Sequence, residues 1–330
     1  MDNLRVGVAG ATGALGKEIV GLLDKAKWRP SALVPLASAS THVSFVEYGG
    51  ERIAVDDLAG EALDSLDALI LAVPSDVAIQ AAERAADEGT LVVDCSGAFL
   101  EDPEVPLCLP WVNPQALSEP LRGIVSIPSS AATLVASALG PLMRAGIDGP
   151  FNATVLMPAS TWGRAGIEEL SRQVVSLFNA GTPPRKVFEH GLAFDLLPQL
   201  GVLEESGWTR DELRVTEELR QILGIQTELD VSMVAAPLFS GVSANCELRP
   251  SRHVPVELAR QILSDGGVRF SEDDSARACP RPRRVEGQPF AHVGRIRHDG
   301  TGNLHFWLAM DNLRASAAVA VSACGVLVRQ

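Results

Sequence analysis

The sequence predicts an α/β protein with a doubly wound, Rossmann-like N-terminal domain and a second, α+β domain. The first observation is that apolar, strand-like runs alternate with helical patterns through the first half, at residues 5–9, 17–23, 32–36, 68–73, 77–86 and 91–94. Strands that alternate with helices of this length are joined by right-handed crossovers. Such crossovers give a parallel sheet that is covered on both faces.

The second observation is a glycine-rich turn between the first strand and the first helix. A phosphate group lies against backbone N–H groups at a helix N-terminus, and glycine lets the backbone come close to it. The turn therefore predicts a dinucleotide site, and the alternative is a tight turn that only packs the helix on the sheet. The expected cofactor-binding residues are Gly10, Ala11, Thr12, Gly13, Ala14, Leu15, Gly16 and, where the second strand ends, Ser38.

The segment around Ser38 does not indicate which dinucleotide is bound. Residues 36–41 supply neither an acid for a ribose 2′-hydroxyl nor an arginine for a 2′-phosphate. The choice between NADP and NAD is therefore open.

The third observation is that the pattern changes in the second half. A strand at 152–157 and a helix at 165–179 precede a helix that starts at the capping box Thr209–Glu212 and ends before Gly224. Strand-like segments at 230–238, 243–248 and 304–310 then predict an antiparallel sheet with helices on one face. The small apolar run at 316–328 predicts a last helix that returns to the first domain.

Composition limits the classes of protein that the chain can belong to. Its 330 residues, 46% of them hydrophobic, are enough for two domains with a large core. A net charge of −13 argues against a nucleic-acid partner, and the basic cluster at 281–284 is interpreted as a solvated loop. The absence of a leader and of a long apolar run predicts a cytoplasmic protein without a membrane partner. Five scattered cysteines without CxxC spacing predict free thiols and no metal site.

Several motifs resemble those of aspartate-semialdehyde dehydrogenases, in the same order over essentially the whole chain. They are the glycine-rich turn, VVDCSGAF (92–99), LAFDLLPQLG with GWTRDELR (192–214), APLFSG (236–241), and VGRIR with DNLR (293–314). Acetylglutamyl-phosphate reductases share the fold, but LLPQLG and GWTRDELR are closer to the aspartate branch. The resemblance implies a dimer with a dinucleotide domain at 1–129 and 311–330 and a dimerisation domain at 130–310. It also implies NADP-dependent, phosphate-coupled oxidation of aspartate semialdehyde, run in reverse for amino-acid biosynthesis.

Family members place a cysteine thiolate at the start of a helix, and the matching segment, Pro128–Ala131, has Ser130 in its place. A helix N-terminus can help to ionise a thiol, whereas an alcohol needs a strong base at hydrogen-bond distance. The resemblance puts that base, a histidine, at Val242, which cannot accept a proton. We therefore interpret Ser130 as a helix N-cap rather than a nucleophile.

Other polar positions of the family are also empty. The arginine that clamps the substrate carboxylate matches Ala235, the substrate-positioning glutamine matches Met157, and the phosphate-binding arginine matches Leu100. Only Glu218 keeps its family residue, at the position that meets the substrate's amino group, with Arg220 where a lysine is usual. A surface carboxylate on a helix is the alternative explanation for Glu218. Without these groups, no transition-state charge is stabilised.

A few further residues have both a functional and a structural interpretation. Cys95 stands where the family often has an asparagine near the cofactor, and a buried cysteine at a strand end is the interpretation that we prefer. Trp162 replaces part of a Gly-Ala-Gly stretch near the nicotinamide, so it either narrows that pocket or packs in the core. His292 and His305 have no acidic neighbour at useful spacing and are interpreted as surface or satisfied histidines. Ala320 replaces an asparagine that approaches the cofactor in relatives.

Three functions are compatible with these observations. The first is a homologue of aspartate-semialdehyde dehydrogenase with a degenerate active site, working as a homodimer or paired with an active paralogue. The second is an active NAD(P)-dependent oxidoreductase on aspartate semialdehyde or on a different, less polar substrate of amino-acid metabolism. The third is a module that binds NADP without turnover.

Overall fold

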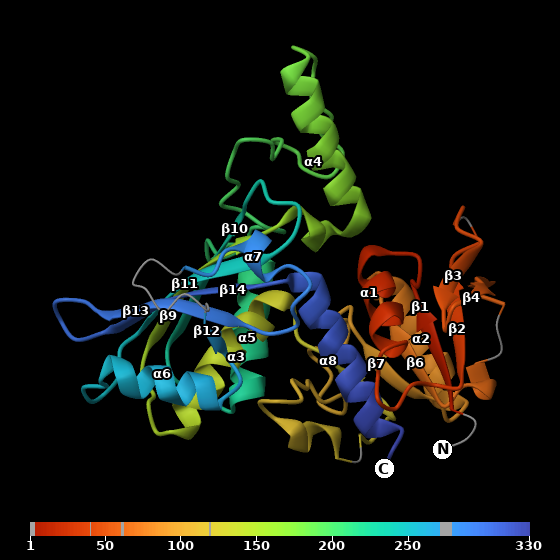
Figure 1. Cartoon of the computed structure of the whole chain (residues 1–330), viewed down its shortest axis with the longest axis horizontal. Coiled ribbons are helices and arrows are strands. Elements are labelled where there is room, and N and C mark those ends of the chain that lie inside the picture. The colour runs from red at the N-terminus through yellow and green to blue at the C-terminus, as the bar shows by residue number, and fades with distance from the viewer. Residues whose placement is uncertain (1–3, 40, 61–62, 119, 271–278) are drawn as a thin grey trace. The chain divides into compact units, whose positions relative to one another are not determined.

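The computed structural model describes residues 4–39, 41–60, 63–118, 120–270 and 279–330, and the chain forms two compact units (Figure 1). Unit 1 comprises residues 1–129 and 316–330, and unit 2 comprises residues 130–315. Each unit is built on its own sheet of six described strands. No described helix combines the length and the apolar character needed to cross a membrane.

Unit 1 is a parallel, doubly wound domain, which confirms the predicted fold class. Its strand order is β5-β2-β1-β6-β7-β8, and every described pairing is parallel. The inner strands are buried almost throughout, as expected for a sheet that is covered on both faces. The elements are β1 (Arg5–Ala9), α1 (Ala14–Leu23), β2 (Ala32–Ala37), β5 (Asp56–Asp57), η1 (Leu63–Ser65), β6 (Ala68–Leu71), α2 (Ser75–Asp87), β7 (Leu91–Asp94), η2 (Pro114–Leu117) and β8 (Ile124–Ser126), with a separate hairpin of β3 (Phe45–Tyr48) and β4 (Glu51–Ala54).

Unit 2 holds a mixed sheet, so the prediction of an antiparallel sheet was wrong. Its order is β10-β9-β11-β14-β13-β12, in which β10 runs parallel to β9 and β12 runs parallel to β13. The chain between β9 and β10 passes through two helices, and a crossover of that length brings a strand back in the same direction. The strands are β9 (Phe151–Met157), β10 (Leu229–Ala235), β11 (Val242–Leu248), β12 (Arg269–Phe270), β13 (His292–His298) and β14 (Leu304–Met310).

Four described helices contact the sheet of unit 2, and the short α7 (Pro282–Val285) does so through β14. Helix α3 contacts β11 and β14, α5 contacts β10, and α6 contacts β12 and β13. The predicted capping box is present at the start of α5: Thr209 Oγ1 accepts the Glu212 N–H, and Glu212 Oε2 accepts the Thr209 N–H at 2.9 Å. Gly224 ends the helix in the left-handed conformation. The helices are α3 (Ser130–Arg144), η3 (Ala159–Trp162), α4 (Gly163–Phe178), α5 (Arg210–Leu223), α6 (Val256–Asp265) and α7 (Pro282–Val285).

The last helix, α8 (Asn312–Leu327), begins in unit 2, and its residues from Ser316 onward belong to unit 1. Asp311 caps it, because Asp311 Oδ1 accepts the N–H groups of Leu313 and Arg314 at 3.1 and 3.0 Å. Near its end Gly325 lies against the indole of Trp28, where a side chain on residue 325 would overlap the ring. The predicted return of the last helix to the first domain is confirmed.

Candidate functional site

The glycine-rich turn of unit 1 is held by its own backbone. The N–H groups of Gly10 and Ala11 donate to the Leu36 carbonyl at 2.8 and 3.2 Å, and the Gly13 N–H donates to Gly10 O at 2.9 Å. Gly10 has φ +78°, and a side chain there would overlap the Ala72 carbonyl. A side chain at Gly16 would overlap the Gly10 carbonyl. The turn therefore packs α1 closely on the sheet at the strand ends.

A cavity of about 630 Å³ opens at the carboxyl ends of β1, β2 and β6. This is where the strand order of a doubly wound sheet reverses, and ligands of such folds bind there. The volume is in the range of small-molecule and cofactor sites. Of the predicted cofactor residues, four line this cavity: Gly10, Thr12, Gly13 and Ser38. The other four, Ala11, Ala14, Leu15 and Gly16, lie in the turn and the first turn of α1.

Two charged residues that sequence reasoning missed also line the cavity. Asp57 comes from the short edge strand β5, and Arg84 comes from the third turn of α2. Arg84 Nη2 and Nη1 donate to the carbonyls of Leu58 and Ala59 at 2.6 and 3.3 Å. Neither residue belongs to a motif, and only the pairing of β5 with β2 brings Asp57 to the site.

The buried carboxylate of Asp94 organises the end of β7. Its Oδ1 accepts the N–H and the hydroxyl of Ser96 at 2.8 and 2.6 Å, and its Oδ2 accepts the Ser126 hydroxyl at 2.9 Å. Cys95 lies between these groups and is half-buried. Burial, followed by the charge of Asp94 and the neighbouring Cys324, raises the pKa of the Cys95 thiol well above its usual value. A thiol held neutral in this way is a poor nucleophile.

Ser130 is the first residue of α3 and is half-buried. The helix therefore begins one residue earlier than an N-cap at Ser130 requires, and Ser129 stands at the cap position. A helix boundary can shift by one residue without a change in the surrounding pattern, which the local sequence does not fix. Helix α3 packs on β11 and β14, so its start belongs to the same unit as Val242.

Three of the four apolar residues at the emptied family positions, Met157, Ala235 and Val242, lie in one row of the sheet of unit 2. Met157 and Ala235 are register partners, Val242 is the partner of Met310, and Ser243 is the partner of Leu156. Val242 is the first residue of β11, and the register of β11 with β9 therefore places it beside Met157. The exposed fractions are 2% for Met157, 1% for Ala235, and 0% for Val242 and Met310. The row is packed core without a polar side chain.

Glu218 lies on α5 and is fully buried, so its interpretation as a surface carboxylate was wrong. Arg214, one turn earlier, donates through Nε to Glu218 Oε1 at 3.0 Å. A buried carboxylate needs such a partner, because removing a charge from water is costly. Helix α5 packs against α3 and β10, and Glu218 lies on its buried side. The sequence of α5 alone does not show which side is buried. Arg220 is more exposed and lies 4.0 Å from Glu217.

The structure treats the two histidines differently: His305 is a satisfied histidine, although it has the acidic neighbour that was not expected, whereas His292 is neither exposed nor satisfied. His305 Nε2 lies 3.2 Å from Asp299 Oδ2, an acidic neighbour six residues away across the β13–β14 hairpin. His292 is buried, and its Nε2 has no hydrogen-bond partner; burial and the charge of Arg269 lower the pKa of the imidazole. Both outcomes depend on strand pairing, which the spacing alone did not predict.

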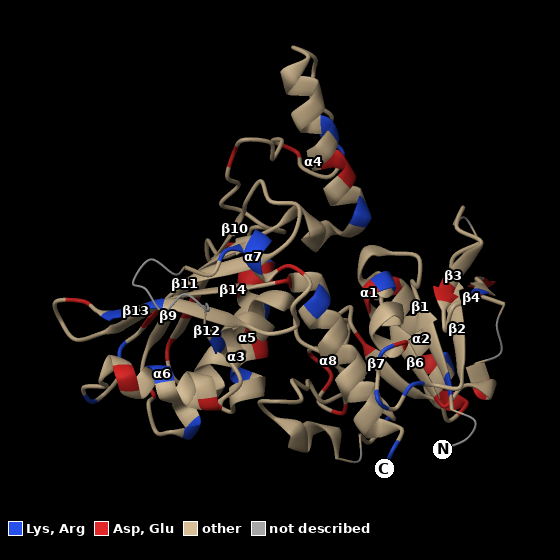
Figure 2. Ribbon diagram, viewed as in Figure 1, with Lys and Arg blue, Asp and Glu red and all other residues tan. Residues whose placement is uncertain are grey.

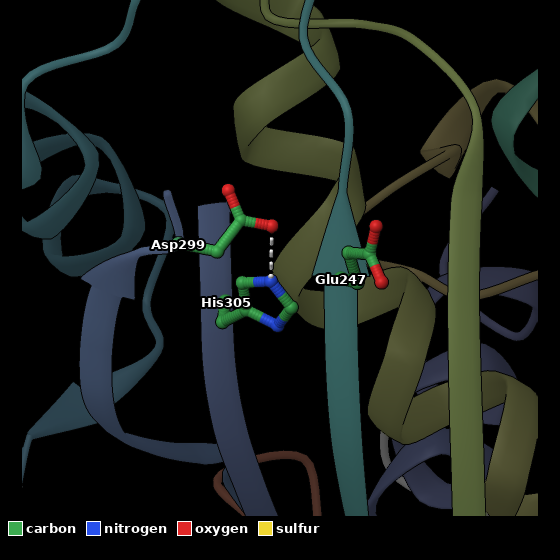
Figure 3. Close-up of side chains that lie close together, drawn as sticks. All are labelled: Glu247, Asp299 and His305. Carbon is green, nitrogen blue, oxygen red and sulfur yellow. Dashed lines mark hydrogen bonds and ion pairs between the residues drawn. The ribbon is translucent and has the colours of Figure 1, made fainter. Parts of the chain in front are cut away.

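Figure 3 shows His305 between Asp299 and Glu247, which is its register partner on β11. The three side chains could in principle hold a metal ion. Hydrogen bonds already engage both carboxylates: Asp299 accepts from Thr301 and Asn303, and Glu247 accepts from Arg249 and Asn303. These bonds, led by that from the Thr301 hydroxyl, hold the pKa of Asp299 well below its usual range. The cluster is therefore interpreted as structural: its hydrogen bonds stabilise the turn between β13 and β14 and connect it to β11.

Trp162 is half-buried, and its ring meets Phe188 edge-on with centroids 5.0 Å apart. This contact supports the packing interpretation of the indole. The narrowing of a nicotinamide pocket by Trp162 stays a hypothesis.

A parallel sheet with a glycine-rich turn, an inserted mixed-sheet unit and a last helix that returns to the first unit are the features of a two-domain protein with a dinucleotide-type first domain. Residues 5–119 match the semialdehyde dehydrogenase NAD binding domain, and residues 139–315 match the semialdehyde dehydrogenase dimerisation domain. The chain belongs to the semialdehyde dehydrogenase family. The NAD-binding assignment of the first domain is therefore confirmed.

Individual relatives agree over the full length. A USG-1 protein homolog from Azotobacter vinelandii is 31% identical, with 98% of each chain covered, and aspartate-semialdehyde dehydrogenase from Synechocystis is 29% identical, with 99% of this chain and 98% of the relative covered. Among solved structures, aspartate semialdehyde dehydrogenase II from Vibrio cholerae, in complex with ASA, superposes with a TM-score of 0.95 at 25% identity, covering 100% of this chain and 99% of that chain. A probable aspartate-semialdehyde dehydrogenase from Pseudomonas aeruginosa has a TM-score of 0.92 at 30% identity, with 99% of each chain covered.

Proposed function

We propose that this chain is a dimeric, non-catalytic member of the family that keeps a dinucleotide-binding domain. The observation that carries the proposal is the buried row of Met157, Ala235 and Val242. These positions match the polar positions of the family, and here they are filled by apolar side chains that are packed into the core.

The chemistry of the usual reaction supports the same conclusion. Formation of a covalent thioester needs a nucleophile that ionises, a base that takes its proton and donors that stabilise the developing charge. Ser130 offers a hydroxyl of high intrinsic pKa, and Val242 offers no lone pair. Glu218 is a carboxylate engaged by Arg214. The residues that remain can maintain the fold of the site, but none of them can take the proton from a nucleophile at position 130.

Dinucleotide binding is supported by the cavity of unit 1. The glycines let α1 begin close against the strand ends beside the cavity, and the cavity volume suits a nucleotide. When bound, the nicotinamide of such a cofactor supplies a hydride acceptor or donor. The residues of the chain that would hold the nucleotide are Gly10, Thr12, Gly13 and Ser38.

Pairing with a second copy is supported by the end of α4 and the loop that follows it. Figure 2 shows that the charged residues of α4 lie at its start and middle, up to Arg172, whereas its end carries none. Phe178 is 79% exposed and Phe194 is 68% exposed, and their rings meet edge-on at 5.9 Å. An exposed apolar cluster of this kind on a dimerisation domain is expected to be covered by a partner. A homodimer is the partner that we propose, and an active paralogue with the same domain is the second candidate.

Activity measurements separate the proposal from its main alternative, an active enzyme on aspartate semialdehyde. The purified protein is mixed with aspartate semialdehyde, phosphate and either NAD or NADP, and the reduced cofactor is followed at 340 nm. The expected result is no turnover with either cofactor. Robust turnover would overturn the proposal. Turnover with less polar aldehydes only would favour an altered substrate.

A further inference from the structure

The short strand β5 delivers a carboxylate to the end of β2. Ala37 and Asp57 are register partners, and the Leu58 N–H donates to the Ala37 carbonyl at 2.9 Å. Ser38 follows Ala37 directly. Asp57 therefore stands beside the place where doubly wound domains usually carry the residue that contacts the adenosine ribose.

The carboxylate of Asp57 is exposed and lines the nucleotide cavity. Its Oδ1 accepts the Ala59 N–H at 3.2 Å, which fixes the side chain at the rim. A carboxylate at this place accepts hydrogen bonds from ribose hydroxyls and repels a phosphate group on the 2′ oxygen. The acid that the end of β2 lacks is thus supplied by the neighbouring strand.

Among the described residues that line the cavity, the one cation is bound to the loop that follows β5. Arg84 lines the cavity, but both of its terminal nitrogens donate to carbonyls of the loop at Leu58 and Ala59. Residues 36–51 contain no lysine and no arginine. Around Ser38 the described lining offers the hydroxyls of Thr12 and Thr41 and one carboxylate, whereas a 2′-phosphate is usually held by an arginine.

We propose that the cavity of unit 1 selects NAD(H) over NADP(H), and that Asp57 is the residue that determines this specificity. The inference rests on the proposed function only in that unit 1 binds a dinucleotide. It does not depend on whether the chain retains any turnover.

Binding of NADH and NADPH to the full-length protein tests the proposal by nucleotide fluorescence and by calorimetry, at one fixed ionic strength. NADH is expected to bind roughly tenfold more tightly than NADPH, the effect of about one charge-assisted hydrogen bond. Asp57→Asn is expected to weaken NADH binding and to narrow the NADH to NADPH affinity ratio about fivefold. Asp56→Asn is the matched control, because Asp56 is the adjacent exposed residue on β5 and is the partner of Leu36. It should leave the ratio unchanged.

Two further variants test the roles of the neighbouring groups. Ser38→Arg combined with Asp57→Asn should reverse the preference in favour of NADPH. Arg84→Lys keeps a positive charge but loses the pair of hydrogen bonds to the carbonyls of Leu58 and Ala59. Because this loss could destabilise the protein, thermal unfolding checks that the variant is folded. If Arg84 held the 2′-phosphate, Arg84→Lys would weaken NADPH binding selectively, and the proposal would be wrong.

The affinities of the wild-type protein for NADH and NADPH distinguish the proposed selectivity from the proposed binding of a dinucleotide. Equal affinity for both nucleotides, or a preference for NADPH, would overturn the selectivity and leave the proposed cofactor domain intact. Absence of binding by either nucleotide would overturn both. Turnover in the activity assay bears on the proposed function alone.

Discussion

Asn312 and Ser160 share a buried side-chain hydrogen bond, with Asn312 Nδ2 3.0 Å from Ser160 Oγ, although 152 residues separate them. Asn312 Oδ1 also accepts the Gly241 N–H at 2.8 Å. One amide at the start of α8 therefore holds η3 and the loop before β11 together. This gives the asparagine of the DNLR motif a structural role within unit 2.

Asn312→Ala is expected to lower the free energy of unfolding by about 2–3 kcal/mol, because it leaves the Gly241 N–H and the Ser160 hydroxyl buried without their partner. Urea denaturation at pH 7 measures the change. Asn179→Ala is the control, since Asn179 is an exposed residue at the end of α4 whose amide bonds only to the Val175 carbonyl. A loss of stability equal to that of the control would contradict the role assigned to Asn312.

Glu169 should make the stability of unit 2 depend on pH. Burial raises the pKa of this carboxyl, but backbone N–H groups of Phe188, Val187 and Lys186 donate to it at 2.8–2.9 Å, and the net pKa is lowered. A folded-state pKa below the unfolded value stabilises the protein above the unfolded pKa, and this contribution is lost as the pH falls through the lower folded pKa.

Glu169→Gln should therefore lower the free energy of unfolding by about 1–3 kcal/mol at pH 7 and by less in acid. Unfolding curves between pH 3 and pH 7 measure the difference. Glu168→Gln removes an adjacent, partly exposed carboxylate that pairs with Arg164 and Arg172, and such surface pairs contribute little. A pH-independent effect of Glu169→Gln would show that its donors stabilise the neutral amide equally well.

Ser130→Cys should not restore dehydrogenase activity. The thiol would stand at the first residue of α3, where the helix N-terminus favours a thiolate, but Val242 still accepts no proton and Ala235 still binds no carboxylate. The rate of cofactor reduction with aspartate semialdehyde and phosphate is the measurement, with Ser129→Cys as the positional control. Activity in Ser130→Cys alone would mean that another residue fills the role assigned to the position of Val242.

Phe178→Glu should weaken self-association at least tenfold, because a charge would then have to be desolvated in the centre of the apolar cluster. Sedimentation velocity over a range of protein concentrations measures the monomer fraction. Leu121→Glu alters a residue of unit 1 that is 84% exposed, and it should have no effect. An unchanged dimer in Phe178→Glu would place the interface elsewhere on unit 2.

The sequence predicted most of the long elements because their signals are local. The period of the apolar residues, the glycine-rich turn and the capping box at Thr209 each act within one helix or strand. The short strands β5, β8 and β12 were missed, since two or three residues show no period. The direction of β10 was missed because it depends on the crossover from β9.

For the site, the sequence by itself determined which residue types stand at the family positions, including Ser130, Ala235 and Val242, and that the first domain carries the glycine-rich turn of a dinucleotide-binding domain. Tertiary structure decided that Met157, Ala235 and Val242 form one buried row, that Glu218 is inside the protein, and that Asp57 reaches the nucleotide cavity. The physical reason is that burial and pairing depend on the strand or helix that packs against a side chain. Those partners come from segments of the chain that are distant in sequence.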